Sequence, residues 1–219
     1  RWRRCVIHCF SYIIKCLINK PNITEATCFE MSKVKLNLIA AACGNLGIGI
    51  NGTLPWKLKK EMAYFTKMTK NVSDPAKMNA VIMGRCSWDA IPLKFRPLAD
   101  RVNIVLTRHP VILMFQVPEG VIVVSNLDDA IKYIDSRSDI ESSWVIGGAT
   151  IYKLAMEHQN CDKIYLTEIH REFECDTFFP TIDKSLFQLT EENGVSSDLQ
   201  TDGDITYNFR VYKKIVNGS

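Results

Sequence analysis

Short apolar runs alternate with amphipathic segments from residue 34 onward. Runs that read as strands cover residues 36–42, 80–83, 102–106, 121–124, 144–146 and 164–167. Such runs, with few polar interruptions, are typical of a sheet that is buried on both faces. Helical patterns lie between them at 57–70, 85–90, 127–136 and 149–157, and Asn126 with Asp129 forms a start signal for the third. The alternation predicts an α/β domain with a largely parallel sheet.

The end of the chain has a different pattern. Apolar side chains recur at every second residue over 205–212, which indicates a half-exposed antiparallel strand. Residues 187–191 are a candidate hairpin partner, with 192–203 as a long loop. We therefore expect one α/β domain: a mostly parallel central sheet of about eight strands, an antiparallel C-terminal hairpin, and flanking helices.

Charge separates the first 30 residues from the rest of the 219-residue chain. The whole chain carries a net charge of +3, and residues 1–30 contain five basic and two acidic side chains, which already gives +3. The remainder is neutral, so it does not call for a nucleic acid or another polyanion. The apolar stretch 5–18 is too short and too polar to span a bilayer, and no cleavage site of small residues follows it. We expect residues 1–30 to be a non-native or disordered N-terminal extension, Met31 to be the natural start, and 31–219 to form the domain.

The eight cysteines show no metal-binding or redox-motif spacing, and the four histidines are dispersed. We interpret all eight cysteines as free thiols in a reducing compartment, which favours a cytoplasmic location. No metal site is expected.

Glu61 is an acid on the apolar side of the helix expected at 57–70. It shares a stripe with Leu58, Met62, Phe65 and Met68, while lysines occupy the opposite face. A carboxylate that faces inward is costly unless a ligand or a partner needs it, so Glu61 is a candidate functional residue. The ordinary alternative is a buried glutamate that a lysine or backbone amides satisfy.

Two glycine-containing segments follow predicted strands. Gly44, Gly47 and Gly49 lack the order of a dinucleotide-binding fingerprint, and the following residues 50–55 cannot continue as a helix, which indicates a glycine-rich flap. Gly147 and Gly148 join a buried strand directly to a helix, where bare backbone amides could hold a phosphate. A simple tight turn is the alternative for this second segment.

Basic residues follow two more strands: Arg85 comes after 81–84, and Arg108 comes with Thr107 and His109 after 104–106. Open α/β sheets bind ligands at the carboxyl ends of their strands, and two arginines there suit a substrate with several phosphates. Solvated surface arginines are the alternative.

Taken together, these segments resemble the dihydrofolate reductase family over about residues 34–215. The resemblance rests on six motifs in order: Gly-Ile-Gly-x-x-Gly-x-Leu-Pro-Trp (47–56), Val-Ile-Met-Gly-Arg (81–85) with Ser87-Trp88, Arg-Pro-Leu-x-x-Arg (96–101), Ile-Gly-Gly-x-x-x-Tyr (146–152), Asp-Thr-Phe-Phe-Pro (176–180), and the terminal Tyr-x-Phe-x-Val-Tyr strand (207–212). It implies that fold, and the reduction of dihydrofolate to tetrahydrofolate by NADPH, which supplies one-carbon metabolism. It also implies a monomer that antifolates inhibit and that needs no nucleic acid or membrane.

The resemblance assigns residues to the substrate side. Glu61 would bind the pterin and assist its protonation, and Thr167 would orient that acid, in a catalytic group that includes Leu54 and Trp56. Met62 and Phe65 would sandwich the substrate, and Arg101 would grip its carboxylate. Residues implied for the far wall and for the pterin edge are Ile91, Pro92, Leu98, Ile39, Ile146 and Tyr152.

The resemblance also assigns the cofactor side. Ala41 and Ile48 would lie beside the carboxamide under a flap at 47–54, and Arg85 and Arg108 would meet the 2′-phosphate of NADPH. The other residues implied for the cofactor are Gly47, Gly49, Gly52, Thr53, Cys86, Ser87, Thr107, Gly147, Gly148, Ala149, Thr150, Ile151 and Tyr152. Cis peptide bonds are implied at Gly147–Gly148 and Arg96–Pro97.

The sequence departs from the family pattern at three places: Thr53 replaces an acidic or amide residue, the segment from Trp56 to Glu61 is one residue shorter than in vertebrate relatives, and Met62 replaces a Phe or Leu. None of these removes a catalytic group. Two other functions remain open at this point: a riboflavin-pathway reductase on the same scaffold, and a non-catalytic folate- or RNA-binding protein. The first would not be expected to combine Glu61, Thr167 and Arg101, and the neutral body argues against the second.

Overall fold

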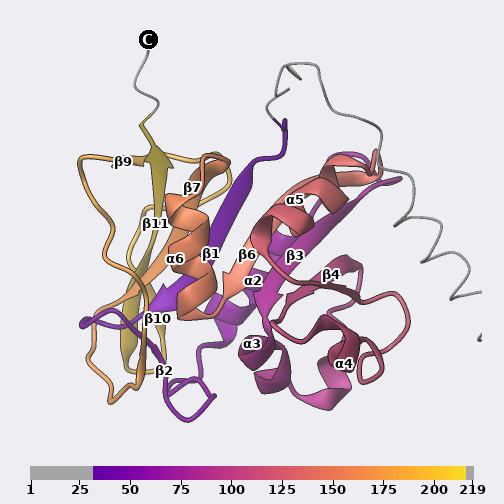
Figure 1. Ribbon diagram of the computed structural model, residues 1–219. Coiled ribbons are helices and arrows are strands. Elements are labelled where there is room, and N and C mark those ends of the chain that lie inside the picture. Colours follow the sequence, from indigo (N-terminus) through magenta and orange to yellow (C-terminus); the bar gives the residue numbers. More distant parts are fainter. Residues whose placement is uncertain (1–31, 216–219) are drawn as a thin grey trace, which may run out of the picture. The chain divides into compact units, whose positions relative to one another are not determined.

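A computed structural model of the protein describes residues 32–215, which form a nine-stranded sheet with helices on both faces (Figure 1). The predictions for residues 1–30 and for the start at Met31 lie outside these described residues. The strands of the sheet are β1 (Leu36–Ala42), β3 (Met78–Gly84), β4 (Arg101–Leu106), β5 (Ile122–Val124), β6 (Ile140–Gly147), β7 (Cys161–Ile169), β9 (Phe187–Thr190), β10 (Gln200–Asp202) and β11 (Ile205–Lys214). A separate two-stranded sheet joins β2 (Gly47–Gly49) to β8 (Thr177–Phe178). The helices are α2 (Lys59–Lys70), α3 (Arg85–Ala90), α4 (Pro110–Met114), α5 (Leu127–Asp135), α6 (Ala149–Glu157) and the short 3-10 helix η1 (Leu93–Phe95).

The predicted α/β class is confirmed by the pairing of the strands. The order along the sheet is β10-β11-β7-β1-β6-β3-β4-β5, and every pair from β7 to β5 is parallel. β11 runs antiparallel to β7, β9 and β10. The first strand therefore lies at the centre, where Leu36 is paired with Ser143 of β6 and with Cys161 of β7.

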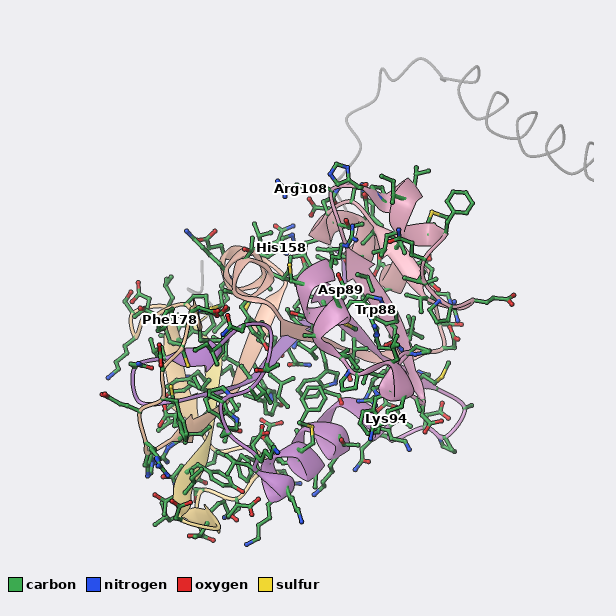
Figure 2. The ribbon with its side chains drawn as sticks, turned by 90° about the horizontal axis from the view of Figure 1, so that it is seen from below. Trp88, Asp89, Lys94, Arg108, His158 and Phe178 are labelled. Atoms are coloured by element: carbon green, nitrogen blue, oxygen red, sulfur yellow. The ribbon has the colours of Figure 1, made fainter. Side chains whose placement is uncertain are left out.

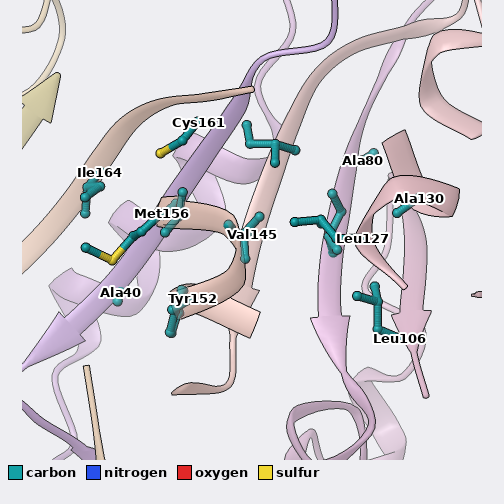
Figure 3. Close-up of a cluster of buried hydrophobic side chains, with 14 of the residues drawn as sticks. Ala40, Ala80, Leu106, Leu127, Ala130, Val145, Tyr152, Met156, Cys161 and Ile164 are labelled. Atoms are coloured by element: carbon teal, nitrogen blue, oxygen red, sulfur yellow. The ribbon is translucent and has the colours of Figure 1, made fainter. Parts of the chain in front are cut away.

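The two faces of the sheet bury two separate apolar layers because side chains alternate along each strand. Leu36, Leu38 and Ala40 of β1 point into the layer covered by α5 and α6, which Figure 3 shows in close-up. Ile39 points the other way, into a layer with Trp88 of α3 and Trp144 of β6. Leu113 of α4 belongs to this second layer, and Phe65 and Met68 of α2 are packed against it. α2 is thus anchored by the face that carries Glu61.

The helix start signal at Asn126 is confirmed. Its side-chain oxygen accepts a 2.8 Å hydrogen bond from the backbone N–H of Asp129, and its amide donates to the Asp129 carboxylate at 2.9 Å. This reciprocal pair satisfies a backbone donor that the first turn of α5 would otherwise leave unpaired.

The structure corrects one detail at the end of the chain. β9 pairs with β11 as predicted, but the predicted loop 192–203 contains the strand β10. β10 forms a hairpin with β11 in which Asp202 is opposite Ile205. The polar sequence Gln-Thr-Asp gave no alternation that could have indicated this strand.

Strand β6 is longer than its apolar residues 144–146 predict, because it begins at Ile140. Its polar residues find partners within the sheet: the Ser143 hydroxyl donates to the carbonyl of Lys35 at 2.6 Å, and that of Ser142 donates to Asn79 Oδ1 at 2.6 Å. The helix α4 was not predicted at all.

No helix in residues 32–215 has both the length and the apolar character needed to cross a membrane.

Candidate active site

Glu61 is buried on the inner face of α2. Its side chain is 5% exposed, and within residues 32–215 its carboxylate forms no ion pair. The hydroxyl of Thr167 in β7, which is 1% exposed, donates a hydrogen bond to Glu61 Oε1 at 3.4 Å. Burial raises the pKa of Glu61 to about 7, and the hydrogen bond from Thr167 opposes part of this rise. A carboxyl group with this pKa is able to hold or release a proton near neutral pH.

The stripe expected on α2 is only partly buried. Leu58 is buried and Phe65 is half-buried, whereas Met62 is 47% exposed and is not packed inward with Glu61 in the free protein. Met62 instead borders the outer surface of α2, beside Lys59 and Thr66. Tyr64, which no sequence pattern indicated, stacks its ring on that of Phe209 with a centroid distance of 3.9 Å.

Three buried polar atoms have no hydrogen-bond partner among residues 32–215: Trp56 Nε1 and the hydroxyls of Tyr64 and Tyr207. The charge on Glu61 contributes to the raised pKa of both tyrosines, after desolvation by burial, which places the two phenols within electrostatic reach of the carboxylate. Orphaned buried donors are costly in a finished core, so this cluster has the character of a binding site.

Tyr152 connects α6 to the central strand. Its hydroxyl donates to the backbone carbonyl of Ile39 at 2.7 Å, so this residue of β1 has its carbonyl turned toward α6. Ile146 is half-buried in β6, beside β1 in the sheet. Two residues expected at the pterin edge, Ile39 and Tyr152, are therefore in direct contact.

Arg101 is half-buried at the start of β4, and two oxygens hold its side chain. Its Nη1 donates to the hydroxyl of Thr69 at 2.9 Å, and its Nε donates to the carbonyl of Ala99 at 3.0 Å. Thr69 is fully buried on α2, and its own hydroxyl donates to the carbonyl of Phe65 at 2.8 Å. Desolvation lowers the pKa of Arg101, yet the guanidinium stays charged. A half-buried, oriented cation of this kind suits a carboxylate ligand.

The three residues expected at the far wall of the substrate site differ in burial. Ile91 and Leu98 are half-buried and are packed against the second apolar layer, whereas Pro92 is exposed. The backbone N–H of Leu98 donates to Asn103 Oδ1 at 2.9 Å, which fixes the loop between η1 and β4. The expected cis bond at Arg96–Pro97 lies in this same loop and is confirmed.

Gly147 and Gly148 lie where β6 ends and α6 begins, joined by the expected cis peptide bond. A Cβ on Gly147 would lie 2.9 Å from Ser87 Oγ, and one on Gly148 would lie 3.2 Å from the same atom. Ser87 belongs to the first turn of α3, so the starts of two helices meet at this glycine pair. Backbone N–H groups at the start of α6 and the bare glycines form a cradle that side chains would fill.

The basic residues expected at this end follow the carboxyl ends of β3 and β4. Arg85 begins α3 and lies 3.4 Å from Asp89 in a partly exposed ion pair, and Arg108 is exposed after the buried Thr107. Figure 2, which views the molecule from this edge of the sheet, shows Arg108 well away from Phe178 of β8. Of the remaining residues expected for the cofactor, Cys86 and Thr150 are exposed, and Ala149 and Ile151 are half-buried.

The expected flap is held to the rest of the protein by β8. β2 pairs with β8 in a short antiparallel sheet, the backbone N–H of Asp176 donates to the carbonyl of Gly49 at 3.0 Å, and that of Asn51 donates to the Asp176 carboxylate at 2.7 Å. The tip is a turn closed by two backbone hydrogen bonds between Ile50 and Thr53, with Gly52 at a φ of +71°. In this loop Ile48 is half-buried, whereas Gly52, Thr53 and Leu54 are exposed; Ala41 of β1 is also half-buried.

Comparisons with known proteins agree with this geometry. A family model described as dihydrofolate reductase matches residues 35–214. The chain is 64% identical to the dihydrofolate reductase of Heliothis virescens over 185 residues, which cover 84% of this chain and 100% of that protein. It is 42% identical to the enzyme of Aedes albopictus, over 83% of this chain and 98% of the relative.

Among solved structures, the dihydrofolate reductase of Schistosoma mansoni superposes with a TM-score of 0.70 at 35% sequence identity, covering 82% of this chain and 98% of that one. The sheet order, the buried acid on α2, the glycine cradle at α6 and these matches agree with one another. The chain belongs to the dihydrofolate reductase family, whose members are NADPH-dependent oxidoreductases.

Proposed function

We propose that this protein reduces 7,8-dihydrofolate to 5,6,7,8-tetrahydrofolate with NADPH, and that Glu61 is the acid on which the reaction depends. The observation that carries this proposal is the burial, on the inner face of α2, of a carboxyl group that forms no ion pair within residues 32–215 and has a pKa of about 7. A carboxylate offers two acceptor oxygens to a ring N–H and a neighbouring amino group, which is the donor pair that a pterin presents.

Glu61 and Thr167 would act together on the proton. Thr167 donates to one carboxyl oxygen of Glu61 and so leaves the other free to face the substrate. Because the pKa lies near neutral pH, the group is able to supply a proton at the stage when the pterin needs one. Leu54 and Trp56 would complete this catalytic group, with Trp56 Nε1, which has no hydrogen-bond partner among residues 32–215, as a further donor.

The remaining substrate contacts would come from α2 and from the elements that face it. Phe65 and Met62 would cover the rings, and Met62 would lose its present exposure when it does so. Ile91, Pro92 and Leu98 would form the opposite wall. Arg101, held by Thr69, would bind the substrate's carboxylate through two parallel hydrogen bonds. Ile39, Ile146 and Tyr152 would border the pterin edge.

The residues present fit a dinucleotide phosphate. The cradle at Gly147 and Gly148 excludes any side chain, because a Cβ at either position would press on Ser87 Oγ. The start of α6 would hold the pyrophosphate with Ala149, Thr150, Ile151 and Tyr152, and the first turn of α3 would contribute Cys86 and Ser87. Arg85, Thr107 and Arg108 would recognise the 2′-phosphate, which NADH lacks.

NADPH supplies the hydride when it is bound. The flap, through Gly47, Ile48, Gly49, Gly52 and Thr53, would cover the nicotinamide beside Ala41 and exclude water from the reacting atoms. A single copy of the chain provides every residue in this scheme, which supports a monomer that acts without nucleic acid. The same acid and arginine would bind antifolates.

The experiment that tests the proposal follows the absorbance of the reduced nicotinamide in the presence of dihydrofolate. Turnover is expected with the wild-type protein, and Glu61→Gln and Glu61→Ala are expected to lose it while they retain the fold and bind NADPH. A Glu61→Gln variant with near wild-type turnover at neutral pH would show that the acid has no catalytic role. Absence of turnover in the wild-type protein would refute the function itself.

A further inference from the structure

Two thiols from distant parts of the chain lie next to each other at the base of the flap. Cys43 directly follows β1, Cys175 precedes β8, and their sulfur atoms are 3.9 Å apart. Cys86 is exposed and Cys161 is buried in the first apolar layer, and neither contacts another thiol within residues 32–215. Cys43 and Cys175 are therefore the described thiols that are positioned to react with each other.

The glycine that begins the flap lies between these two thiols. A Cβ on Gly47 would overlap Cys175 Sγ, and would lie 2.7 Å from Cys175 Cβ and 2.9 Å from Cys43 Sγ. Both sulfur atoms are thus packed against the Cα of Gly47. The backbone N–H of Cys43 also donates to the carbonyl of Gly47 at 2.9 Å. Because both sulfur atoms contact Gly47, any change in the distance between them must also shift the backbone of Gly47.

We propose that Cys43 and Cys175 form a reversible disulfide when the protein meets a small disulfide such as glutathione disulfide, and that this bond slows turnover by fixing the base of the flap. The second part rests on the proposed role of the flap as the cover of the nicotinamide. The first part depends only on the two thiols.

The chemistry consists of two exchange steps. The Cys175 thiolate attacks one sulfur of glutathione disulfide, forms a mixed disulfide, and releases one glutathione thiolate. The Cys43 thiolate then attacks the Cys175 sulfur of the mixed disulfide, forms the Cys43–Cys175 bond, and releases the second glutathione. The two cysteines lose two electrons and two protons, and glutathione disulfide takes up both electrons and both protons to become two glutathione molecules.

The order of these steps follows from exposure. Cys175 is half-buried and open to a soluble reagent, whereas Cys43 is 3% exposed. The Cys43 thiol donates to Asn45 Oδ1 at 2.9 Å, and it must leave this partner to attack. Desolvation, followed by the nearby Cys43 thiol, raises the pKa of Cys175. Because the thiolate is the reacting form, the reaction should accelerate as the pH rises above neutral.

The disulfide should restrict the flap because it draws together the two sulfur atoms that flank Gly47, the first residue of the flap. A disulfide requires the sulfur atoms to approach to about 2 Å, from the observed 3.9 Å. The end of β1 and the segment before β8 would then be joined across Gly47. The flap is already held by β8 through Gly49 and Asp176, so the added bond would oppose its release. A lid that opens slowly limits turnover.

The test uses the full-length protein, reduced and then incubated with glutathione disulfide, followed by thiol blocking, tryptic digestion and mass spectrometry. A disulfide would link the peptide 36–57 to the peptide 172–184, with a mass lower by two hydrogen atoms than their sum. The matched variants are Cys43→Ser and Cys175→Ser. Cys43→Ser should accumulate glutathione on Cys175, because the thiol that resolves the mixed disulfide is gone. Cys86→Ser removes the exposed thiol, and its oxidised activity is compared with its own reduced activity.

We expect the linked peptide in the wild-type protein, together with a loss of turnover on the order of tenfold that dithiothreitol reverses. Cys43→Ser and Cys175→Ser should keep their reduced activity after the same treatment, and Cys86→Ser should lose the same fraction of its own reduced activity as the wild type loses. Glutathione that remains on Cys175 of the wild-type protein, without a linked peptide, would overturn the disulfide. A linked peptide with unchanged turnover would contradict the claim that the disulfide slows turnover by fixing the flap. Absence of activity in the reduced protein would instead refute the proposed function, since the linked peptide is read without any turnover.

Discussion

Arg101 donates a 2.9 Å hydrogen bond from Nη1 to the hydroxyl of Thr69, a fully buried residue on the helix that carries Glu61. This bond joins the start of β4 to α2, so the arginine proposed to hold the substrate's carboxylate is oriented by the same helix that presents the acid. Thr69 is thus a positioning residue, since it acts through Arg101.

We predict that Thr69→Val raises the KM for dihydrofolate by roughly tenfold or less while kcat changes little, because one hydrogen bond to a charged group is lost. Arg101→Leu should raise the KM further. Steady-state kinetics with saturating NADPH measure both. Thr66→Val, an exposed position one turn earlier on α2, is the control and should leave the KM unchanged. An equal rise in the KM for dihydrofolate in Thr69→Val and Thr66→Val would show that Thr69 does not position Arg101.

The acidity of Glu61 predicts how activity depends on pH. The carboxyl group has a pKa of about 7 in the free protein, so its protonated form declines above that pH. We expect kcat/KM for dihydrofolate to fall by about tenfold per pH unit above this value and to level off below it. A profile measured across the neutral range tests this. A profile that stays flat through pH 7 would show that the protonated acid is not required.

The same acid predicts that stability without ligand depends on pH. The pKa of Glu61 is raised from 4.5 in the unfolded chain to about 7 in the folded protein, so the folded state binds more protons between these values. Its contribution to the free energy of unfolding therefore falls as the pH rises through this window. Above it, Glu61→Gln should be more stable than the wild type by roughly 3 kcal/mol, and the difference should vanish below pH 4.5. Denaturant unfolding at several pH values measures this, with the exposed Glu157→Gln as a control that should show no such trend.

The exposed Arg108 predicts the choice of cofactor. Because NADPH and NADH differ by one phosphate, Arg108→Ala should lower kcat/KM for NADPH by about tenfold to a hundredfold and leave that for NADH nearly unchanged. The comparison of both cofactors at fixed dihydrofolate provides the measurement, and Lys213→Ala on β11 controls for the loss of an exposed cation. An equal loss of kcat/KM with NADH would show that Arg108 does not recognise the 2′-phosphate.

Much of this structure was predicted from local patterns. The helices at 85–90 and 149–157 match their predicted bounds. The helix predicted at 127–136 ends one residue earlier, at Asp135. The predicted strand at 36–42 also matches, because continuous apolar residues have few other stable environments. Glu61 stood out because it is an acid on an apolar stripe, and the structure buries it.

Other features could not be predicted because their partners are distant in the chain. Thr69 gave no signal as a threonine in a helix, since its bond to Arg101 depends on the meeting of α2 and β4. Met62 fits the stripe by spacing, yet it is exposed, because no helix or strand within residues 32–215 covers it. Helix α4 carries an apolar sequence with Val111, Ile112 and Met114 exposed, so it lacks the periodicity of a surface helix.

The central position of β1 has a consequence for how the chain matures during synthesis. Leu36 emerges early from the ribosome, but its neighbours Ser143 and Cys161 are translated much later. Until then an apolar strand with both edges unpaired must persist in the nascent polypeptide, a state prone to misassociation. The centre of the sheet, with Thr167 beside Glu61, is therefore completed only after the last parallel strand, β7, has been translated.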